Sequence, residues 1–323
     1  MALFNARKRR TLSLVAGLAL LASAASAQAQ TQTTERVLRI GYQKYGSLVL
    51  LKGQGALEKR LAQLNIQVKW TEFPAGPVLL EGLNVGSIDF GQVGEAPPIF
   101  AQAAGANLVY VGHEPPEPAG EAILVKADSP IKNVAELKGR KIALNKGSNV
   151  HYLLVKLLEK AGLQYKDVEL AFLPPADARA AFERGSVDAW VIWDPFLAAA
   201  QKQIGARVLA DGKGVVTNYP FFLATRPYAE KNGDVIAIVL EELAKVDEWA
   251  KHHPKDVAAQ LSALIGLDVP TTELSVSHNS FGVKPVSEAV LAQQQKIADL
   301  FFELKLIPKQ INVRDAALIS PKH

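Results

Sequence analysis

The chain has no cysteine among its 323 residues, which excludes disulfide bridges, thiol nucleophiles and cysteine-based metal sites. It also lacks a Gly-x-Ser-x-Gly motif, and the adjacent residues His252 and His253 do not have the i, i+4 spacing of a helical metal site. No convincing set of nucleophile, base and orienting residue is present. We therefore expect no catalytic residue, no metal site, no cofactor and no enzymatic activity.

Long apolar runs are missing too, apart from residues 12–21, which are too few to span a bilayer. This run follows four basic residues and precedes Ala25-Ser26-Ala27, which fits a signal-peptide cleavage site. We predict that residues 1–27 are a signal peptide and that the rest of the chain is exported to the periplasm. The alternative is an N-terminal anchor that is not cleaved.

An excess of charge of one sign is absent from the predicted mature chain. The whole chain has a formal charge of +4, but residues 1–27 carry four basic residues and no acidic residue, so the remainder is neutral. Binding of nucleic acid needs clustered basic residues, so we expect no nucleic-acid partner. About 295 residues remain after cleavage, and with an apolar fraction near one half they suffice for two domains that each have a core.

A short sequence recurs within the chain. Gly86-Ser87-Ile88-Asp89 reappears 99 residues later as Gly185-Ser186-Val187-Asp188. Two looser matches follow the same order and nearly the same spacing: Ile40-Gly41 with Ile142-Ala143, and Phe73-Pro74 with Leu173-Pro174. Gly-Ser-x-Asp is a common turn sequence, so chance is the alternative. The common order favours two similar α/β lobes that enclose a ligand cleft.

Apolar segments of strand length alternate with helical segments in both halves, which predicts parallel sheets covered by helices. Three prolines within residues 115–118 interrupt the alternation and indicate a crossing between the lobes. A second crossing is expected where Tyr219 and Pro220 precede an apolar strand. The predicted fold is α/β with two parallel-sheet lobes: residues 37–117 and 219–323 form lobe one, and residues 118–218 form lobe two.

The segment Gly94-Glu95-Ala96 connects a predicted strand to a predicted helix. The carboxyl ends of parallel strands are where α/β folds bind ligands, and a helix start offers free N–H groups. Gly94 would let a ligand approach closely, whereas Pro97 and Pro98 cannot donate hydrogen bonds. The segment indicates an anion site, and the alternative is an ordinary strand-to-helix turn.

The matching turn in the second half is Lys146-Gly147-Ser148-Asn149. Ser148 or Asn149 could cap the helix that begins near Val150. The same groups could instead donate hydrogen bonds to an anion. The sequence leaves both roles open, and Gly147, Ser148 and Asn149 are candidate ligand-binding residues.

Three more candidates lie at strand ends or at a crossing. Gln43 ends the first predicted strand, and its amide can both donate and accept hydrogen bonds. Trp193 ends another strand and is expected to cover an apolar ligand tail, whereas Trp190 is assigned to the core. Tyr219 is expected to reach into the cleft, and the alternative is a hinge held by Pro220.

Four segments together resemble the aliphatic sulfonate-binding periplasmic proteins of ABC importers, which are type II periplasmic binding proteins. The likeness runs over residues 37–313. Related binders of taurine, nitrate and thiamine precursors share the lobes but less of these segments. The segments that carry the resemblance are residues 94–104, 146–154, 190–195 and 278–282.

The resemblance implies a two-lobed binding-protein fold that clamps a sulfonate between its lobes. It also implies that the protein delivers the sulfonate to an ABC permease in the inner membrane for sulfur acquisition. We expect the protein to be a monomer. A sulfonate is a permanent monoanion, and neutral dipoles can hold such a group without arginine. The alternatives are a binder of taurine, nitrate or a pyrimidine precursor of thiamine, and an enzyme built on the same fold.

Overall fold

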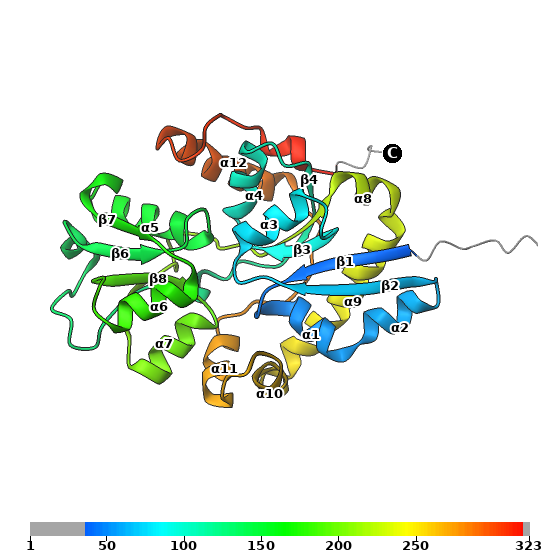
Figure 1. Cartoon of the computed structure of the whole chain (residues 1–323), viewed down its shortest axis with the longest axis horizontal. Helices are drawn as coiled ribbons and strands as arrows, with labels where there is room; N and C mark the ends of the chain where they lie inside the picture. Colours follow the sequence, from blue (N-terminus) through cyan, green and yellow to red (C-terminus); the bar gives the residue numbers. More distant parts are fainter. Residues whose placement is uncertain (1–35, 319–323) are drawn as a thin grey trace, which may run out of the picture. The chain divides into compact units, whose positions relative to one another are not determined.

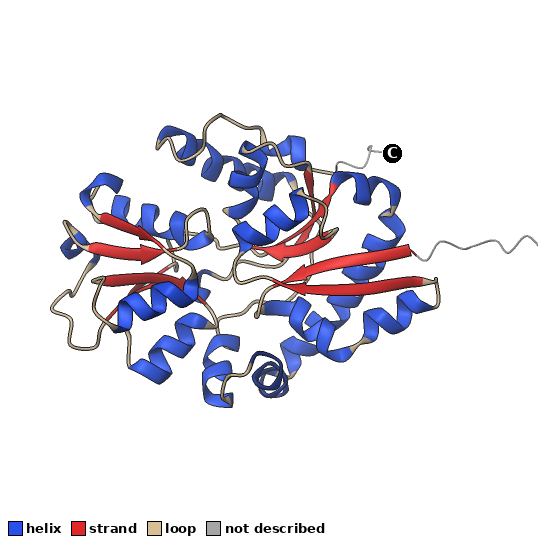
Figure 2. Cartoon of the chain, viewed as in Figure 1, coloured by secondary structure: helices blue, strands red, loops and turns tan. Residues whose placement is uncertain are grey.

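The computed structural model describes residues 36–318, so the predicted signal peptide lies outside the described residues. Within these residues the strands form two sheets of five strands each. Figure 1 follows the chain through both sheets, and Figure 2 shows helices on both faces of each sheet. The expected two-lobed α/β fold is confirmed.

The first sheet has the strand order β2–β1–β3–β10–β4. Strand β1 is parallel to β2 and β3, whereas β10 is antiparallel to β3 and β4. The strands of this sheet are β1 (Arg36–Tyr42), β2 (Ile66–Glu72), β3 (Phe90–Val93), β4 (Leu108–His113) and β10 (Phe221–Thr225).

The second sheet repeats this plan with the order β7–β6–β8–β5–β9. Strand β6 is parallel to β7 and β8, whereas β5 is antiparallel to β8 and β9. The strands are β5 (Glu121–Val125), β6 (Lys141–Leu144), β7 (Glu169–Phe172), β8 (Ala189–Trp193) and β9 (Arg207–Asp211).

The sheets are mixed, and the expectation of purely parallel sheets was wrong for one strand in each. Both exceptions, β5 and β10, directly follow a crossing between the sheets. Glu121 at the start of β5 pairs with Trp193 at the end of β8, and Phe221 at the start of β10 pairs with Val93 at the end of β3. A chain that arrives at the carboxyl ends of the strands has to run antiparallel to them.

Helices connect the strands and also form most of the C-terminal part. Helix α11 packs against α7, which covers the second sheet, so the C-terminal helices contact both lobes (Figure 1). The helices are α1 (Gly46–Gln54), α2 (Ala56–Ala62), α3 (Gly76–Asn84), α4 (Pro97–Ala103), α5 (Asn149–Lys160), α6 (Pro175–Glu183), α7 (Phe196–Ile204), α8 (Arg226–Lys231), α9 (Gly233–His252), α10 (Pro254–Ile265), α11 (Val269–Val276) and α12 (Glu288–Glu303). Short 3₁₀ turns occupy Pro118–Gly120, Val134–Leu137, Tyr165–Asp167 and Val313–Ala316.

The recurring Gly-Ser-x-Asp sequence ends equivalent helices in the two lobes. Gly86 follows α3 with a φ angle of 71°, and Gly185 follows α6 with a φ angle of 74°. Only glycine adopts this left-handed conformation without strain. The next N–H group, of Ser87 or Ser186, donates to a carbonyl in the last turn of the helix at 2.9 Å in both lobes. The repeat is therefore a helix stop followed by a strand.

The aspartate of the repeat anchors the neighbouring strand. Asp89 Oδ2 accepts a hydrogen bond from the backbone N of Arg39 at 2.9 Å, and Asp188 Oδ2 accepts one from the backbone N of Lys141 at 2.8 Å. Asp89 is buried and also binds the Arg39 guanidinium through Nε at 2.9 Å and Nη2 at 2.6 Å. Asp188 is more exposed, and its nearest cation, the Arg140 guanidinium, is 3.7 Å away.

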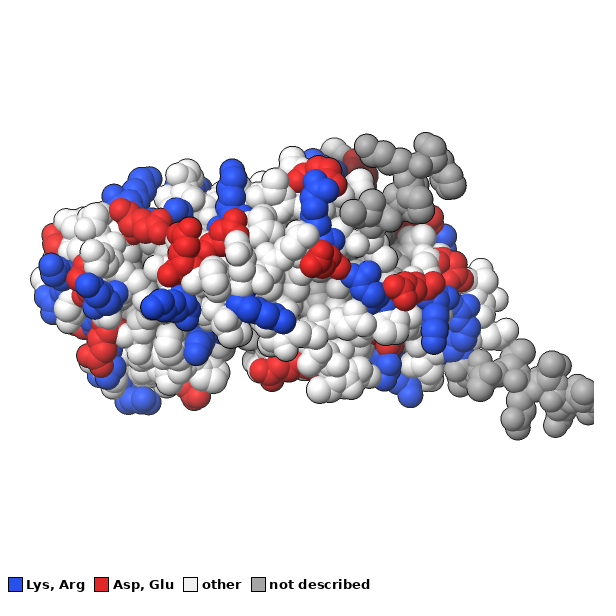
Figure 3. All heavy atoms as spheres, turned by 90° about the horizontal axis from the view of Figure 1, so that it is seen from above, with Lys and Arg blue, Asp and Glu red and all other residues white. Residues whose placement is uncertain are grey.

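An apolar cluster spans the two lobes on the side of α4, α5 and α12. Phe301 of α12 lies 4.9 Å from Phe100 of α4 and 6.0 Å from Tyr152 of α5, measured between ring centroids. Lys, Arg, Asp and Glu are interspersed over the face shown in Figure 3, so this face has no broad basic patch. No helix within residues 36–318 combines the length and the apolar character needed to cross a membrane.

Because the same Gly-Ser-x-Asp turn occurs once in each lobe, Asp89 and Asp188 form a matched pair for mutation. We expect Asp89→Ala to lower the free energy of unfolding by about 2 kcal/mol, since it removes charge-assisted hydrogen bonds to the Arg39 guanidinium, whose side chain is 42% exposed, as well as the bond to the Arg39 backbone. Asp188→Ala should cost about 1 kcal/mol, the typical contribution of a single hydrogen bond. Urea denaturation of the two variants and the parent measures both values. Equal losses would show that the Arg39 ion pair adds nothing to the backbone hydrogen bond.

Candidate functional site

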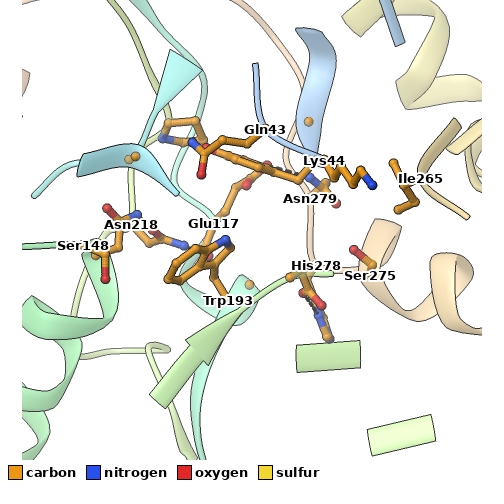
Figure 4. A pocket seen from close by; sticks show the side chains of 18 of the residues that line it. Gln43, Lys44, Glu117, Ser148, Trp193, Asn218, Ile265, Ser275, His278 and Asn279 are labelled. Atoms are coloured by element: carbon orange, nitrogen blue, oxygen red, sulfur yellow. Dashed lines mark hydrogen bonds and ion pairs between the residues drawn. The ribbon is translucent and has the colours of Figure 1, made fainter. Parts of the chain in front are cut away.

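A pocket lies where the carboxyl ends of the strands of both sheets face each other (Figure 4). Its lining comes from strand ends, from helix starts and from both crossings between the lobes. Helices α10 and α11 and the loop after α11 close another side. The lining residues are Gln43, Lys44, Tyr45, Gly46, Gly76, Gly94, Pro97, Glu117, Gly120, Ser148, Asn149, Trp193, Asp194, Asn218, Pro220, Leu261, Ile265, Thr272, Ser275, His278 and Asn279.

Four helix starts line this pocket. One is α4, which begins at Pro97 and has no N–H group there, and the other three are α1 at Gly46, α3 at Gly76 and α5 at Asn149. The residue before each start makes no side-chain hydrogen bond to the first turn. The first N–H groups of a helix have no partner within the helix, and the helix dipole places partial positive charge there. Three sets of uncapped N–H groups therefore converge on one pocket, an arrangement suited to an anion.

The two basic side chains of the pocket lining, Lys44 and His278, already have partners. Lys44 Nζ lies 3.4 Å from Glu72, and half of the Lys44 side chain is exposed. His278 Nδ1 lies 2.7 Å from Asp194 Oδ2. Burial raises the pKa of Asp194, and the hydrogen bond from His278 opposes that rise. No unpaired cationic side chain lines the pocket within residues 36–318, so helix dipoles are its main source of positive potential.

Five of the nine predicted site residues line the pocket: Gln43, Gly94, Ser148, Asn149 and Trp193. Gln43 donates from Nε2 to the carbonyl of Gln92 at 3.1 Å, which leaves its amide oxygen as a free acceptor. Ser148 is the residue before α5, but its hydroxyl donates to the carbonyl of Asn145 at 2.7 Å and does not cap the helix. The capping role that the sequence left open for Ser148 is therefore not observed.

Asn149 joins the two lobes beside the pocket. Its Nδ2 donates to Asn218 Oδ1, and its Oδ1 accepts from the backbone N of Ala96 at 3.4 Å. A methyl group added to Gly94 would lie 1.8 Å from Asn149 Nδ2. Gly94 thus permits close approach as predicted from the sequence, although in this structure the approaching group is a side chain of the other lobe.

The other four predicted residues lie behind the lining. Glu95 is fully buried, and its Oε2 accepts from Thr217 Oγ1 at 2.6 Å and from the backbone N of Tyr219 at 3.1 Å. Ala96 donates to Asn149, and the backbone N of Gly147 donates to His151 Nδ1 at 3.2 Å. These residues connect segments of the pocket to each other rather than face its interior.

Several lining residues were missed by the sequence analysis. Glu117 belongs to the first crossing, and His278 follows α11. Leu261 and Ile265 of α10 form an apolar wall, and Thr272 and Ser275 of α11 contribute hydroxyl groups. His278 and Asn279 belong to segment 278–282, which entered the sequence analysis only as one of the four segments that carry the family resemblance.

Trp193 provides the main aromatic surface of the pocket. It ends β8, packs edge-on against Phe196 at a centroid distance of 6.1 Å, and remains partly exposed, whereas Trp190 is fully buried in the core. In Figure 4 the indole lies between Ser148 and Asn218 on one side and Ile265 on the other. The pocket therefore combines polar helix starts with an apolar region. Within residues 36–318 no cluster of three or more His, Asp or Glu side chains is arranged to hold a metal ion.

Comparison with known proteins gives consistent matches. A family model described as NMT1/THI5-like matches residues 65–257. A relative from Escherichia coli strain K12, named as an aliphatic sulfonates-binding protein, is 49% identical over 92% of this chain and 93% of its own length.

Two solved structures have the same fold. The periplasmic aliphatic sulphonate binding protein SsuA from Escherichia coli matches with a TM-score of 0.79, 49% identity and coverage of 89% of this chain and 95% of that chain. The alkanesulfonate-binding protein SsuA from Xanthomonas axonopodis pv. citri, bound to MOPS, matches with a TM-score of 0.83, 43% identity and coverage of 88% and 98%.

His151 supports the α5 side of the pocket from within the protein. Its ring is fully buried and stacks on Phe100 at a centroid distance of 6.0 Å. Nδ1 accepts from the backbone N of Gly147, so Nε2 carries the proton and donates to Tyr165 Oη at 2.6 Å. Burial, assisted by the charge of Lys146, lowers the pKa of His151 to about 4.

This pKa predicts an acid-dependent loss of stability. Because the folded pKa lies below the unfolded value of about 6.5, the contribution of neutral His151 is complete above that value and is lost as the pH falls toward 4. We expect the difference in free energy of unfolding between the parent and His151→Gln to shrink by about 3 kcal/mol between pH 7 and pH 4. The buried carboxyls occur in both proteins and cancel in the comparison. A difference that stays constant with pH, measured by urea denaturation, would contradict the assignment.

Proposed function

Since the chain belongs to the aliphatic sulfonate-binding proteins of the NMT1/THI5-like family, we propose that it captures alkanesulfonates and delivers them to an ABC importer. Its ligand is held between the two lobes, and its partner is the membrane permease of that importer. We propose that it acts in the periplasm as a monomeric binding protein and not as an enzyme. The names of the E. coli and Xanthomonas relatives support this proposal.

The observation that carries the proposal is the convergence of three uncapped helix starts on a pocket to which residues 36–318 contribute no unpaired cationic side chain. A sulfonate has three oxygens that accept hydrogen bonds and one charge that does not titrate near neutral pH. Backbone N–H groups and helix dipoles match both properties. The Ser148 hydroxyl can turn from Asn145 toward such a ligand, because a hydroxyl rotates freely about its bond.

The apolar part of the pocket suits the carbon chain of an alkanesulfonate. Trp193 lies at the end of β8, and Leu261 and Ile265 lie on α10. Nitrate has no apolar part to cover, so the indole would gain nothing from it. The MOPS bound to the Xanthomonas relative is a propanesulfonate with a bulky amine, which supports a site that tolerates large substituents.

We further propose that the lobes have the predicted boundaries, with residues 37–117 and 219–323 in lobe one and residues 118–218 in lobe two. The membership of the two sheets supports this division. The nine predicted site residues are proposed to act in two ways. The five that line the pocket contact the ligand, whereas Glu95, Ala96, Gly147 and Tyr219 hold the lining in place.

The first test of this function is a ligand screen on the protein without residues 1–27. We expect methane-, butane- and octanesulfonate to stabilise it against thermal unfolding, by about 2.7 kcal/mol when the ligand is at 100 times its Kd. Nitrate and thiamine pyrimidine precursors should have no effect. Stabilisation by either of these, with none by any sulfonate, would contradict the proposal.

A second test separates recognition of the anion from recognition of the tail. Ser148→Ala should weaken all sulfonates by a similar factor, since a hydrogen bond to a charged group contributes about 1.5–3 kcal/mol. Trp193→Ala should weaken octanesulfonate more than methanesulfonate, by about 0.8 kcal/mol for each methylene that the indole covers. Titration calorimetry across the chain-length series measures both effects.

The two variants serve as controls for each other because both line one pocket. If Trp193→Ala costs the same for every chain length, the indole does not contact the tail. If Ser148→Ala leaves all affinities unchanged, the anion is held by backbone N–H groups alone.

A further inference from the structure

Glu117 places a carboxyl group in the pocket from the first crossing between the lobes. The residue is only 7% exposed, and it lines the pocket together with the other residues of the site (Figure 4). Its Oε1 accepts hydrogen bonds from the backbone N of Ser280 at 2.7 Å and from Asn279 Nδ2 at 3.4 Å. Within residues 36–318 no hydrogen bond involves its Oε2, and this oxygen is not one of the buried polar atoms that lack a partner, so it is accessible from the pocket.

Asp194, the other carboxyl of the pocket lining, differs in this respect. Its Oδ1 accepts from the backbone N of Ala198 at 3.0 Å, and its Oδ2 pairs with His278. Both of its oxygens are therefore occupied. Glu117 is the lining carboxyl that has a free oxygen to offer a ligand.

Glu117 is also connected to the proposed anion side of the pocket. Asn218 donates from Nδ2 to the Glu117 carbonyl at 2.8 Å and accepts from Asn149 Nδ2 at its Oδ1. Two hydrogen bonds thus lead from the start of α5 to Glu117. The lining of one pocket therefore contains helix starts, which are partially positive, and this carboxyl group.

From this arrangement we propose that Glu117 binds a protonated amine carried by the sulfonate, so that the preferred ligands are zwitterionic aminoalkanesulfonates. The inference rests on the proposed function and specifies its substrate class. An ammonium group donates hydrogen bonds and carries the charge that a carboxylate pairs with. A plain alkanesulfonate satisfies the helix starts but leaves Glu117 Oε2 without a partner.

The protonation of Glu117 makes this proposal measurable. Burial raises the pKa of Glu117 to about 8, so in the free protein the group is mostly neutral at pH 7. An amine cation stabilises the ionised carboxylate and lowers this pKa on binding. The titratable groups near Glu117 are Tyr45, Glu114, Asp194 with its partner His278, and Asp247.

Binding of an aminosulfonate at pH 7 should therefore release nearly one proton, whereas binding of a plain sulfonate should release none. Above pH 9 the carboxyl is already ionised, and the release should disappear. Calorimetry in phosphate and in Tris buffer measures the release, because these buffers differ in ionisation enthalpy and contain no sulfonate.

The decisive experiment compares propanesulfonate with 3-aminopropanesulfonate on the full mature chain. We expect the amine to increase affinity about tenfold or more, the effect of one hydrogen bond between charged groups. Glu117→Gln retains the volume and the Oε1 acceptor, and it should remove both this preference and the proton release. Thermal unfolding of the variant without ligand shows that it folds, and the preference is read as the ratio of the two affinities within each protein.

Glu169→Gln is the matched control, because it removes an exposed carboxyl of β7 that pairs with Lys141 and lies outside the pocket. This variant should keep the preference and the proton release. The proposal is overturned if 3-aminopropanesulfonate binds no more tightly than propanesulfonate, if no proton is released, or if Glu117→Gln retains either effect. Failure of both ligands to bind would instead overturn the proposed function.

Discussion

The starts of α1, α3 and α5, which the preceding side chains do not cap, are the feature on which the rest of the pocket depends. Backbone donors that are shielded from water without a partner are unfavourable, so a ligand that accepts from them stabilises the protein. Dipoles fixed in the backbone do not titrate, and they hold an anion without the strong attraction of an arginine. Such a site suits capture followed by release, since no buried charge is left unpaired when the ligand departs.

The duplicated plan of the lobes brings these helix starts together. Helix α1 follows β1 in the first sheet as α5 follows β6 in the second, and the carboxyl ends of both strands face the pocket. The recurring Gly-Ser-x-Asp sequence made this plan predictable, because its glycine stops a helix and its aspartate anchors a strand in both copies. Strand direction was not predictable in the same way. Strands β5 and β10 are short and buried, and their direction depends on the side from which the chain enters the sheet.

The site was predictable to the extent that it lies at strand ends. That rule located Gln43, Gly94 and Trp193, and the turn before α5 located Ser148 and Asn149. The residues that it missed depend on the path of the chain in three dimensions: Asp194 and His278 are 84 positions apart, and α10 and α11 reach the pocket from the C-terminal part. Glu95 is buried, and its carboxylate accepts from the backbone N of Tyr219, a contact that joins positions 124 residues apart.

Two buried carboxyl groups, Glu114 and Asp247, contribute to the electrostatic potential at the start of α1. Ser47, the second residue of α1, forms hydrogen bonds with both Glu114 and Asp247. A hydroxyl has one proton to donate, so both contacts can be hydrogen bonds only when one of these carboxyls is protonated and donates to Ser47. Burial raises the pKa of Glu114 and of Asp247, which favours the neutral form. With both carboxyls ionised, their charge would oppose the dipole of α1 at its first turn.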